Sequence, residues 1–144
     1  MGFNLQIGEA VIDCDADYCT ISLSVIDEEH EDAPAFGEPT DRSNQRWPSY
    51  SNWHNFIEKF NLSDVFNDEE KGLLREHPGI SLITQWHKKR IDEEYEAFMR
   101  RYPNAKASYE TDSLNDKYLV RMVWLRYWVD WALSNCKVPS FYNS

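Results

Sequence analysis

The sequence is poor in cysteine and has no long apolar run. Its three cysteines, Cys14, Cys19 and Cys136, are an odd number without the dense spacing of a disulfide framework, which favours reduced thiols and a cytoplasmic setting. Residues 1–6 lack the basic and apolar regions of a signal peptide. No apolar stretch approaches the roughly 20 residues that cross a bilayer. We therefore expect a cytoplasmic protein with no membrane partner.

Sequence motifs of the common catalytic and metal sites are missing as well. The four histidines show no His-x-x-x-His spacing and there is no Cys-x-x-Cys, so no metal site is predicted. The acidic run at residues 27–32 lacks the ligand spacing and central glycine of a calcium loop. There is no Gly-x-Ser-x-Gly, and no pair of carboxylates stands out for acid–base work. The sequence predicts a non-enzymatic protein with no catalytic residues, metal or cofactor.

Positive charge is scarce relative to negative charge. Lys and Arg number 15 against 25 Asp and Glu, which gives a formal net charge of −10. A negative surface repels duplex nucleic acid, so direct binding to a duplex is not expected. The acidic balance suits a basic partner, although solubility alone also accounts for it.

Aromatic residues, in contrast, are abundant. They make up 15% of the 144 residues, with six Trp and eight Tyr, which is enough apolar material for a core. A chain of this length has the usual size of one domain. We expect a single domain over residues 1–144.

The N-terminal residues show the period of β-strands. Apolar residues alternate with polar ones over residues 19–25, as in a half-buried strand. They also alternate over residues 3–7, but the apolar phase shifts by one position after Gly8, which is typical of a β-bulge. Residues 1–26 therefore predict a bulged β-hairpin that turns at residues 15–17 and packs on the rest of the chain.

Residues 27–48 predict a long loop and residues 49–144 a mainly helical body of three to four helices. Apolar residues three or four apart mark helices after Pro48, Ser63 and Ser81, and Ser113 begins a capping-box pattern. The last helix is apolar on two sides, which favours a central position. The fold class that follows is α+β, with the C-terminal helix at the centre.

The same C-terminal helix also suggests an interface. One of its apolar sides carries Trp124, Trp128 and Trp131. If the hairpin and the other helices do not cover this side, the three rings form an exposed patch that binds a partner or a second copy of the chain.

A second candidate site lies where the long loop enters the first helix. Its residues are Arg42, Arg46, Trp47, Tyr50 and His54. Guanidinium groups bind phosphate, a helix N-terminus offers free N–H groups to an anion, and aromatic rings stack on a base. This combination suits a nucleotide-like small molecule. An equally concrete alternative is a structural loop that its tryptophans hold against the core and whose arginines neutralise nearby acids.

Several segments of the chain resemble small uncharacterised proteins encoded by bacteriophages. They are residues 37–40, 47–53, 74–79, 128–133 and 141–144, and the similarity spans most of the chain after residue 33. The resemblance supplies no activity and no site residues. It implies a phage gene product in the host cytoplasm, and by analogy a protein that works by binding.

Two functions from different classes follow from these observations. The chain docks on a host protein, inhibiting a host defence, through acidic and aromatic surface. Alternatively, it sequesters a nucleotide-like small molecule in a pocket built around residues 42–54. The net charge of −10 favours docking, because it works against an anionic ligand. An enzyme of unknown class is the third possibility.

Overall fold

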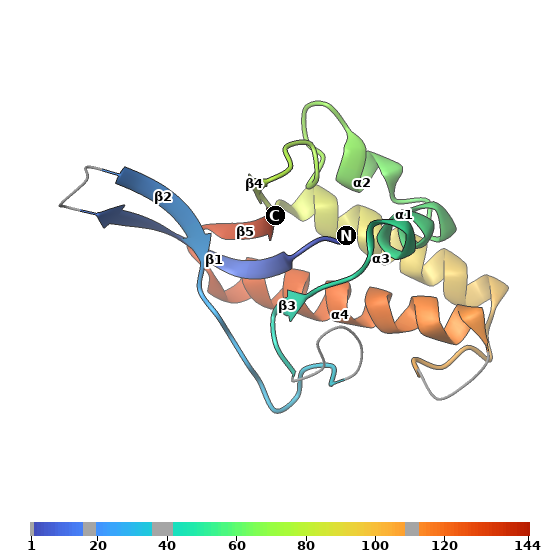
Figure 1. The fold of residues 1–144 in the computed structure, drawn as a ribbon. Helices are drawn as coiled ribbons and strands as arrows, with labels where there is room; N and C mark the ends of the chain where they lie inside the picture. Colours follow the sequence, from blue (N-terminus) through green and yellow to red (C-terminus); the bar gives the residue numbers. More distant parts are fainter. Residues whose placement is uncertain (1, 16–19, 36–41, 109–112) are drawn as a thin grey trace.

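The computed structural model describes residues 2–15, 20–35, 42–108 and 113–144 (Figure 1). The chain is α+β, as the sequence predicts: strands come first, helices follow, and the last helix precedes a final strand. The elements are β1 (Leu5–Asp15), β2 (Thr20–Val25), β3 (Gln45–Arg46), α1 (Tyr50–Lys59), α2 (Ser63–Asn67), β4 (Gly79–Leu82), α3 (Gln85–Arg101), α4 (Leu114–Asn135) and β5 (Pro139–Asn143).

The strands form one antiparallel sheet in the order β2-β1-β5-β4, and the short strand β3 pairs with the start of β1. Strand β5 therefore lies between the first long strand and β4, although it is the last element of the chain. The sequence did not predict β3, β4 or β5; residues 49–144 form the mainly helical body that it indicated, with β4 and β5 added to it. These strands have two to five residues each, which is too short for the alternation that marks a strand.

Strand β1 changes its partner midway. Residues 5–9 pair with β5, and residues 10–15 pair with β2. Neither pairing contains the extra residue of a β-bulge. The shift of the apolar pattern after Gly8 coincides instead with the change of partner from β5 to β2. The first half of β1 buries Leu5 and Ile7 in the core, whereas the second half belongs to the hairpin. The predicted turn of the hairpin falls mostly on residues 16–19, outside the described part.

Helix α4 is the centre of the domain, as predicted. It packs against β1, β5, α1 and α3, and its buried residues point in most directions around its axis. Trp124, Leu125, Trp128 and Val129 are all at most 2% exposed. At these four positions, the sheet and the other helices of the same chain cover the two apolar sides that the sequence indicated.

The other two long helices begin where the sequence supplies a cap. The Ser49 hydroxyl accepts a hydrogen bond from the Asn52 N–H at 3.2 Å, which satisfies one free donor at the start of α1. At the start of α3 the Thr84 N–H donates to His87 Nδ1 at 3.0 Å. The far end of that ring, Nε2, donates to the Lys71 carbonyl at 2.6 Å. His87 therefore ties α3 to the segment before β4.

Asn44 holds both ends of the long loop against the sheet. It is fully buried, and its Nδ2 donates to the carbonyls of Ile7 and Ile26 at 2.8 and 2.9 Å. Its Oδ1 accepts from the Glu28 N–H at 3.0 Å, while its own N–H donates to the Glu28 carbonyl at 3.0 Å. The loop, in its described residues, thus runs along a defined path beside β1 and α4.

Candidate functional site: an acidic and aromatic surface

His30 fastens the acidic segment of residues 27–32 to helix α4. Its Nδ1 lies 3.0 Å from the Tyr127 hydroxyl, and its Nε2 lies 3.2 Å from a Glu28 carboxylate oxygen. Its ring centre lies 4.8 Å from that of Trp128 and 5.0 Å from that of Trp131. The imidazole thus sits among three aromatic rings of one helix, and a carboxylate of its own segment holds its outer nitrogen.

The electrostatics of this cluster keep the Tyr127 phenol neutral. Burial raises its pKa above the ordinary value, and the nearby negative charge of Asp32 adds to this. The Glu28 carboxylate can only accept, so His30 Nε2 donates to it, and in that tautomer Nδ1 accepts from the Tyr127 hydroxyl. The chain of carboxylate, imidazole and hydroxyl resembles the order of groups in a hydrolase triad. Here the two hydrogen bonds hold the segment in place on α4.

Four carboxylates of the segment are exposed; Asp32 lies near the Tyr127 hydroxyl, whereas Asp27 accepts from the Gln6 and Gln45 side chains of the sheet, both at 2.7 Å. Asp27, Glu29, Glu31 and Asp32 are exposed, whereas Tyr127 and Trp131 are half-buried. Asp130 adds a further exposed carboxylate from α4. We call the following set the acidic–aromatic surface: Glu29, Glu31, Asp32, Tyr127, Asp130 and Trp131.

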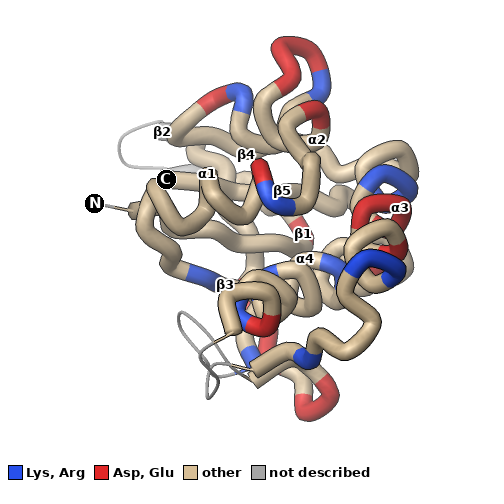
Figure 2. Tube along the Cα trace, turned by 90° about the vertical axis from the view of Figure 1, so that its right-hand side faces the viewer, with Lys and Arg blue, Asp and Glu red and all other residues tan. Residues whose placement is uncertain are grey.

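Tyr127 also lines a hollow of about 280 Å³ between α3 and α4. The cations of this hollow are already paired. Lys88 Nζ lies 2.6 Å from Asp92 and 3.4 Å from Asp130, and Arg126 Nε donates to Asp92 at 3.1 Å. Burial alone raises the pKa of Asp92, but the hydrogen bonds from these two cations bring it below its ordinary value. Acidic and basic residues likewise alternate along the rest of α3 (Figure 2), so the positive charge here is balanced.

The structure does not bring the predicted nucleotide site together. Arg46 is fully buried, with its guanidinium 5.8 Å from the centre of the Trp124 ring. The Arg42 guanidinium donates instead to the carbonyls of Glu31 and Ala33, which fixes the path of the loop. The two arginines therefore have structural roles. They contribute to a loop held in place, as in the alternative interpretation, through carbonyl and ring contacts.

The aromatic members of that predicted site lie elsewhere. Trp47 is 57% exposed. The Tyr50 hydroxyl lies 3.1 Å from His77 Nε2, and the rings of Tyr50 and His54 pack on Phe3 at 4.5 and 5.7 Å. These contacts join the start of the chain to α1 and to the segment before β4.

The structure places two of the three tryptophans of the predicted interface in the core. Trp124 is 2% exposed and Trp128 is fully buried, so neither ring is available to a partner. Trp124 Nε1 donates to the Ser43 carbonyl at 3.0 Å, which anchors the second half of the long loop. Of the three, Trp131 is the one that reaches the surface, and it does so within the acidic–aromatic surface.

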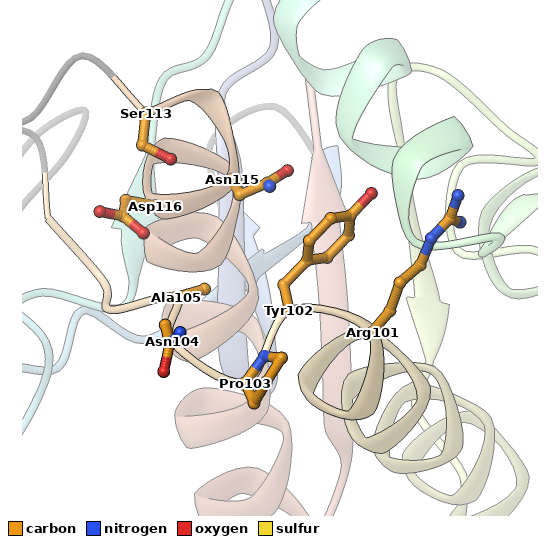
Figure 3. Close-up of a pocket in the computed structure, with 8 residues that line it drawn as sticks. All are labelled: Arg101, Tyr102, Pro103, Asn104, Ala105, Ser113, Asn115 and Asp116. Atoms are coloured by element: carbon orange, nitrogen blue, oxygen red, sulfur yellow. The ribbon is translucent and has the colours of Figure 1, made fainter.

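A second hollow, of about 420 Å³, lies between the end of α3 and the start of α4 (Figure 3). Arg101, Tyr102, Asn115 and Asp116 are among its lining residues, and Asp116 accepts from the Lys106 N–H at 3.0 Å. An arginine and a carboxylate line the same space, so no ligand charge is favoured. None of the residues predicted for nucleotide binding lines it.

Two further findings concern the described residues alone. No three His, Cys, Asp or Glu side chains come together there as metal ligands. Within the same ranges, none of the helices combines the length and the apolar character of a membrane span.

Comparison with protein-family models, with curated proteins and with solved structures finds no match to this chain. The fold class and the geometry above are therefore the basis for any functional argument.

Proposed function

We propose that this chain is a non-enzymatic binding protein that docks on a basic surface of a partner protein through its acidic–aromatic surface. The observation that carries the proposal is the anchoring of residues 27–32 by His30. That anchor presents several carboxylates in one arrangement beside partly exposed Tyr127 and Trp131.

Each part of the surface has a physical role in docking. Carboxylates attract a basic partner over a distance and speed the encounter. Half-buried aromatic rings supply the apolar contacts on which most binding energy depends. An anchored segment loses little conformational freedom on binding, which lowers the entropic cost. The net charge of −10 also favours a basic partner, because it attracts cationic surfaces.

The resemblance to phage proteins supplies the setting of this proposal. A phage protein of this kind acts in the host cytoplasm, and docking on a host defence protein blocks the surface that the defence protein uses. A basic surface that normally binds nucleic acid is the chemical class of target that the carboxylates fit.

Reversal of charge on the segment tests the proposal. The triple variant Glu29→Lys, Glu31→Lys, Asp32→Lys changes the acidic–aromatic surface. The control Glu69→Lys, Glu70→Lys, Glu76→Lys makes the same change of net charge at exposed positions outside that surface. Host proteins retained by the immobilised wild-type chain are purified, and their affinity for the three chains is measured by calorimetry at two salt concentrations.

The proposal predicts that the first triple variant loses at least tenfold in affinity and most of the salt dependence, while the control stays within about threefold of wild type. Equal affinity of the two variants would mean that the acidic–aromatic surface is not the docking site.

A further inference from the structure

A hollow of about 330 Å³ lies where strand β4 meets the start of helix α3 and residues 70–75. Strand β4 is at the edge of the sheet, beside the start of α3 (Figure 1). The volume falls within the range of about 300–1,000 Å³ that is usual for small-molecule sites. Neither the acidic–aromatic surface nor the residues predicted for nucleotide binding contribute to the described lining of this hollow.

Hydrogen bonds fix the segment that forms one wall of the hollow. The Lys71 carbonyl accepts from His87 Nε2 at 2.6 Å, which joins this wall to α3. The Asp68 carboxylate accepts from the N–H groups of Glu70 and Lys71 at 2.9 and 3.0 Å. The Arg75 guanidinium donates to the Glu70 carbonyl at 2.6 Å. The wall therefore has a defined shape, and the backbone of its own turn engages the Asp68 carboxylate.

Ser81 of β4 brings a hydroxyl without a partner to this hollow. It pairs with Phe141 of β5, and paired residues point to the same face of a sheet. Phe141 is fully buried, so the Ser81 side chain is on the face toward the helices, where it is 8% exposed. Its hydroxyl makes no hydrogen bond with any residue that the structure describes, and it lines the hollow. A hydroxyl buried to this extent normally has a partner, so it is left to donate to a molecule in the hollow.

Two cations that line the hollow, Lys71 and Arg75, have no carboxylate partner among the described residues. The cations in the first half of α3 differ in this respect. Lys88, Lys89 and Arg90 each lie within 4.0 Å of a carboxylate oxygen. Their charges are balanced inside the fold, whereas those of Lys71 and Arg75 are available to an anion.

The start of α3 adds to the positive potential of the hollow. The N-terminal end of a helix carries a partial positive charge, and α3 has 17 residues with no acidic residue in its first turn. Its cap, Thr84, lines the hollow. Glu70 is the acidic residue of the described lining, so two cations and a helix end face one carboxylate. The hollow is thus locally positive in a chain whose net charge is −10.

We propose that this hollow binds a small organic phosphate. A phosphate monoester carries between one and two negative charges at neutral pH and has three strong acceptor oxygens. Those oxygens match the two cations and the Ser81 hydroxyl, while a carboxylate brings a single charge. Leu82, 56% exposed beside Ser81, offers an apolar contact to the organic part of the ligand.

Phenyl phosphate is the probe for this site, and amide-resolved NMR of the isotope-labelled chain at constant ionic strength measures its binding. We expect saturable shifts of the amide signals of residues 70–75 and 81–87. Ser81→Ala removes a hydroxyl that has no partner in the fold, so it leaves the fold unchanged and weakens the binding by about tenfold or more. Arg75→Gln removes one of the two charges and weakens the binding by a similar factor.

The matched control is Arg100→Gln. Arg100 is also an exposed cation without a carboxylate partner in the described part of the chain, but it lies at the other end of α3. We expect this variant to bind phenyl phosphate within about twofold of wild type, because the distant charge is screened. Benzoate, which replaces the phosphate by a carboxylate, binds the wild type about tenfold more weakly or less.

Three results would overturn the proposal. Shifts that spread over the surface without saturating would show a non-specific attraction. Equal affinity of wild type and Ser81→Ala would place the anion away from this hollow. Equal affinity of the wild type for benzoate and phenyl phosphate would remove the assignment to phosphate. The proposal is independent of the docking function, since no partner protein enters this experiment and the acidic–aromatic surface does not include these residues.

Discussion

His30 and Tyr127 are joined by a hydrogen bond of 3.0 Å, although they lie 97 positions apart in the sequence. This bond links the acidic segment to the central helix. Because the Glu28 carboxylate can only accept, the imidazole donates to it through Nε2, and Nδ1 in that tautomer accepts from the Tyr127 hydroxyl. One ring thereby holds a carboxylate-rich segment on an aromatic surface.

We predict that Tyr127→Phe loosens this segment and leaves the rest of the fold intact. The variant loses one side-chain hydrogen bond, which lowers the free energy of unfolding by about 0.5–1.5 kcal/mol. Amide exchange over residues 27–33 becomes faster, as mass spectrometry can measure. His30→Ala, which also removes the ring contacts with Trp128 and Trp131, has the larger effect on both quantities. The control His54→Ala, whose ring contacts Phe3 and not this segment, leaves amide exchange over residues 27–33 unchanged. Unchanged exchange in both His30→Ala and Tyr127→Phe would contradict the anchoring role.

A second prediction separates the two arginines of the long loop. Arg46→Ala removes a fully buried side chain beside Trp124 and lowers the free energy of unfolding by about 3 kcal/mol or more. Arg42→Ala removes an exposed side chain that donates to two carbonyls, and it costs about 1 kcal/mol. Urea denaturation of the two variants measures the difference. If the two substitutions lower the free energy of unfolding by the same amount, the burial of Arg46 adds no stability of its own.

A third prediction concerns the pH dependence of stability through His87. Burial lowers its pKa below the ordinary 6.5, because the charged imidazolium loses its hydration. The unfolded chain therefore binds the proton more readily than the folded chain. The stability that neutral His87 contributes is fully present above about pH 6.5, and it is lost as the pH falls from there toward the folded pKa.

Thermal melts between pH 5 and 8 measure this effect. We expect the melting temperature of the wild type to fall more steeply below pH 6.5 than that of His87→Gln. The slope is the relevant quantity, because the variant also loses the hydrogen bonds to Lys71 and Thr84 and is less stable at every pH. Parallel curves for the two chains would assign the pH dependence to other groups.

A fourth prediction concerns the reactivity of Cys136. Burial raises the pKa of its thiol to about 11, and the charges of Glu9 and Glu28 contribute to this. At pH 8 about one thiol in a thousand is then ionised, so reaction with a disulfide reagent is slow in the native state. In a Cys14→Ser, Cys19→Ser background, we expect the rate to rise by two to three orders of magnitude on unfolding in urea. A native rate equal to the unfolded rate would show that the thiol is not protected.

The elements that the sequence predicts correctly are those with a repeated local pattern. The alternation over residues 19–25 marks β2, and the two apolar sides of the last helix place α4 at the centre. Strand β5 has no repeated pattern of its own, because its five residues depend on pairing with the distant strands β1 and β4. The buried Arg46 is missed for a similar reason, since a charged residue next to an exposed Trp47 has the local pattern of a surface loop.

The candidate site was partly predictable. An acidic and aromatic docking surface is what the charge and the tryptophans indicate, but the rings that the sequence singles out are mostly in the core. His30 escapes notice because it stands inside an acidic run that has the pattern of a solvated turn. Its partners come from α4, and the spacing of residues along either segment alone does not show that they meet.

The central place of β5 in the sheet has a consequence for the order of folding. The hairpin of β1 and β2 and the neighbouring helices α1 and α2 make contacts that are local in sequence, and they can form while the chain emerges from the ribosome. The first half of β1 and all of β4 must wait, because both pair with residues 139–143. A nascent chain that ends before Pro139 therefore leaves two strand edges open, and chaperones would recognise it as unfinished until those five residues arrive.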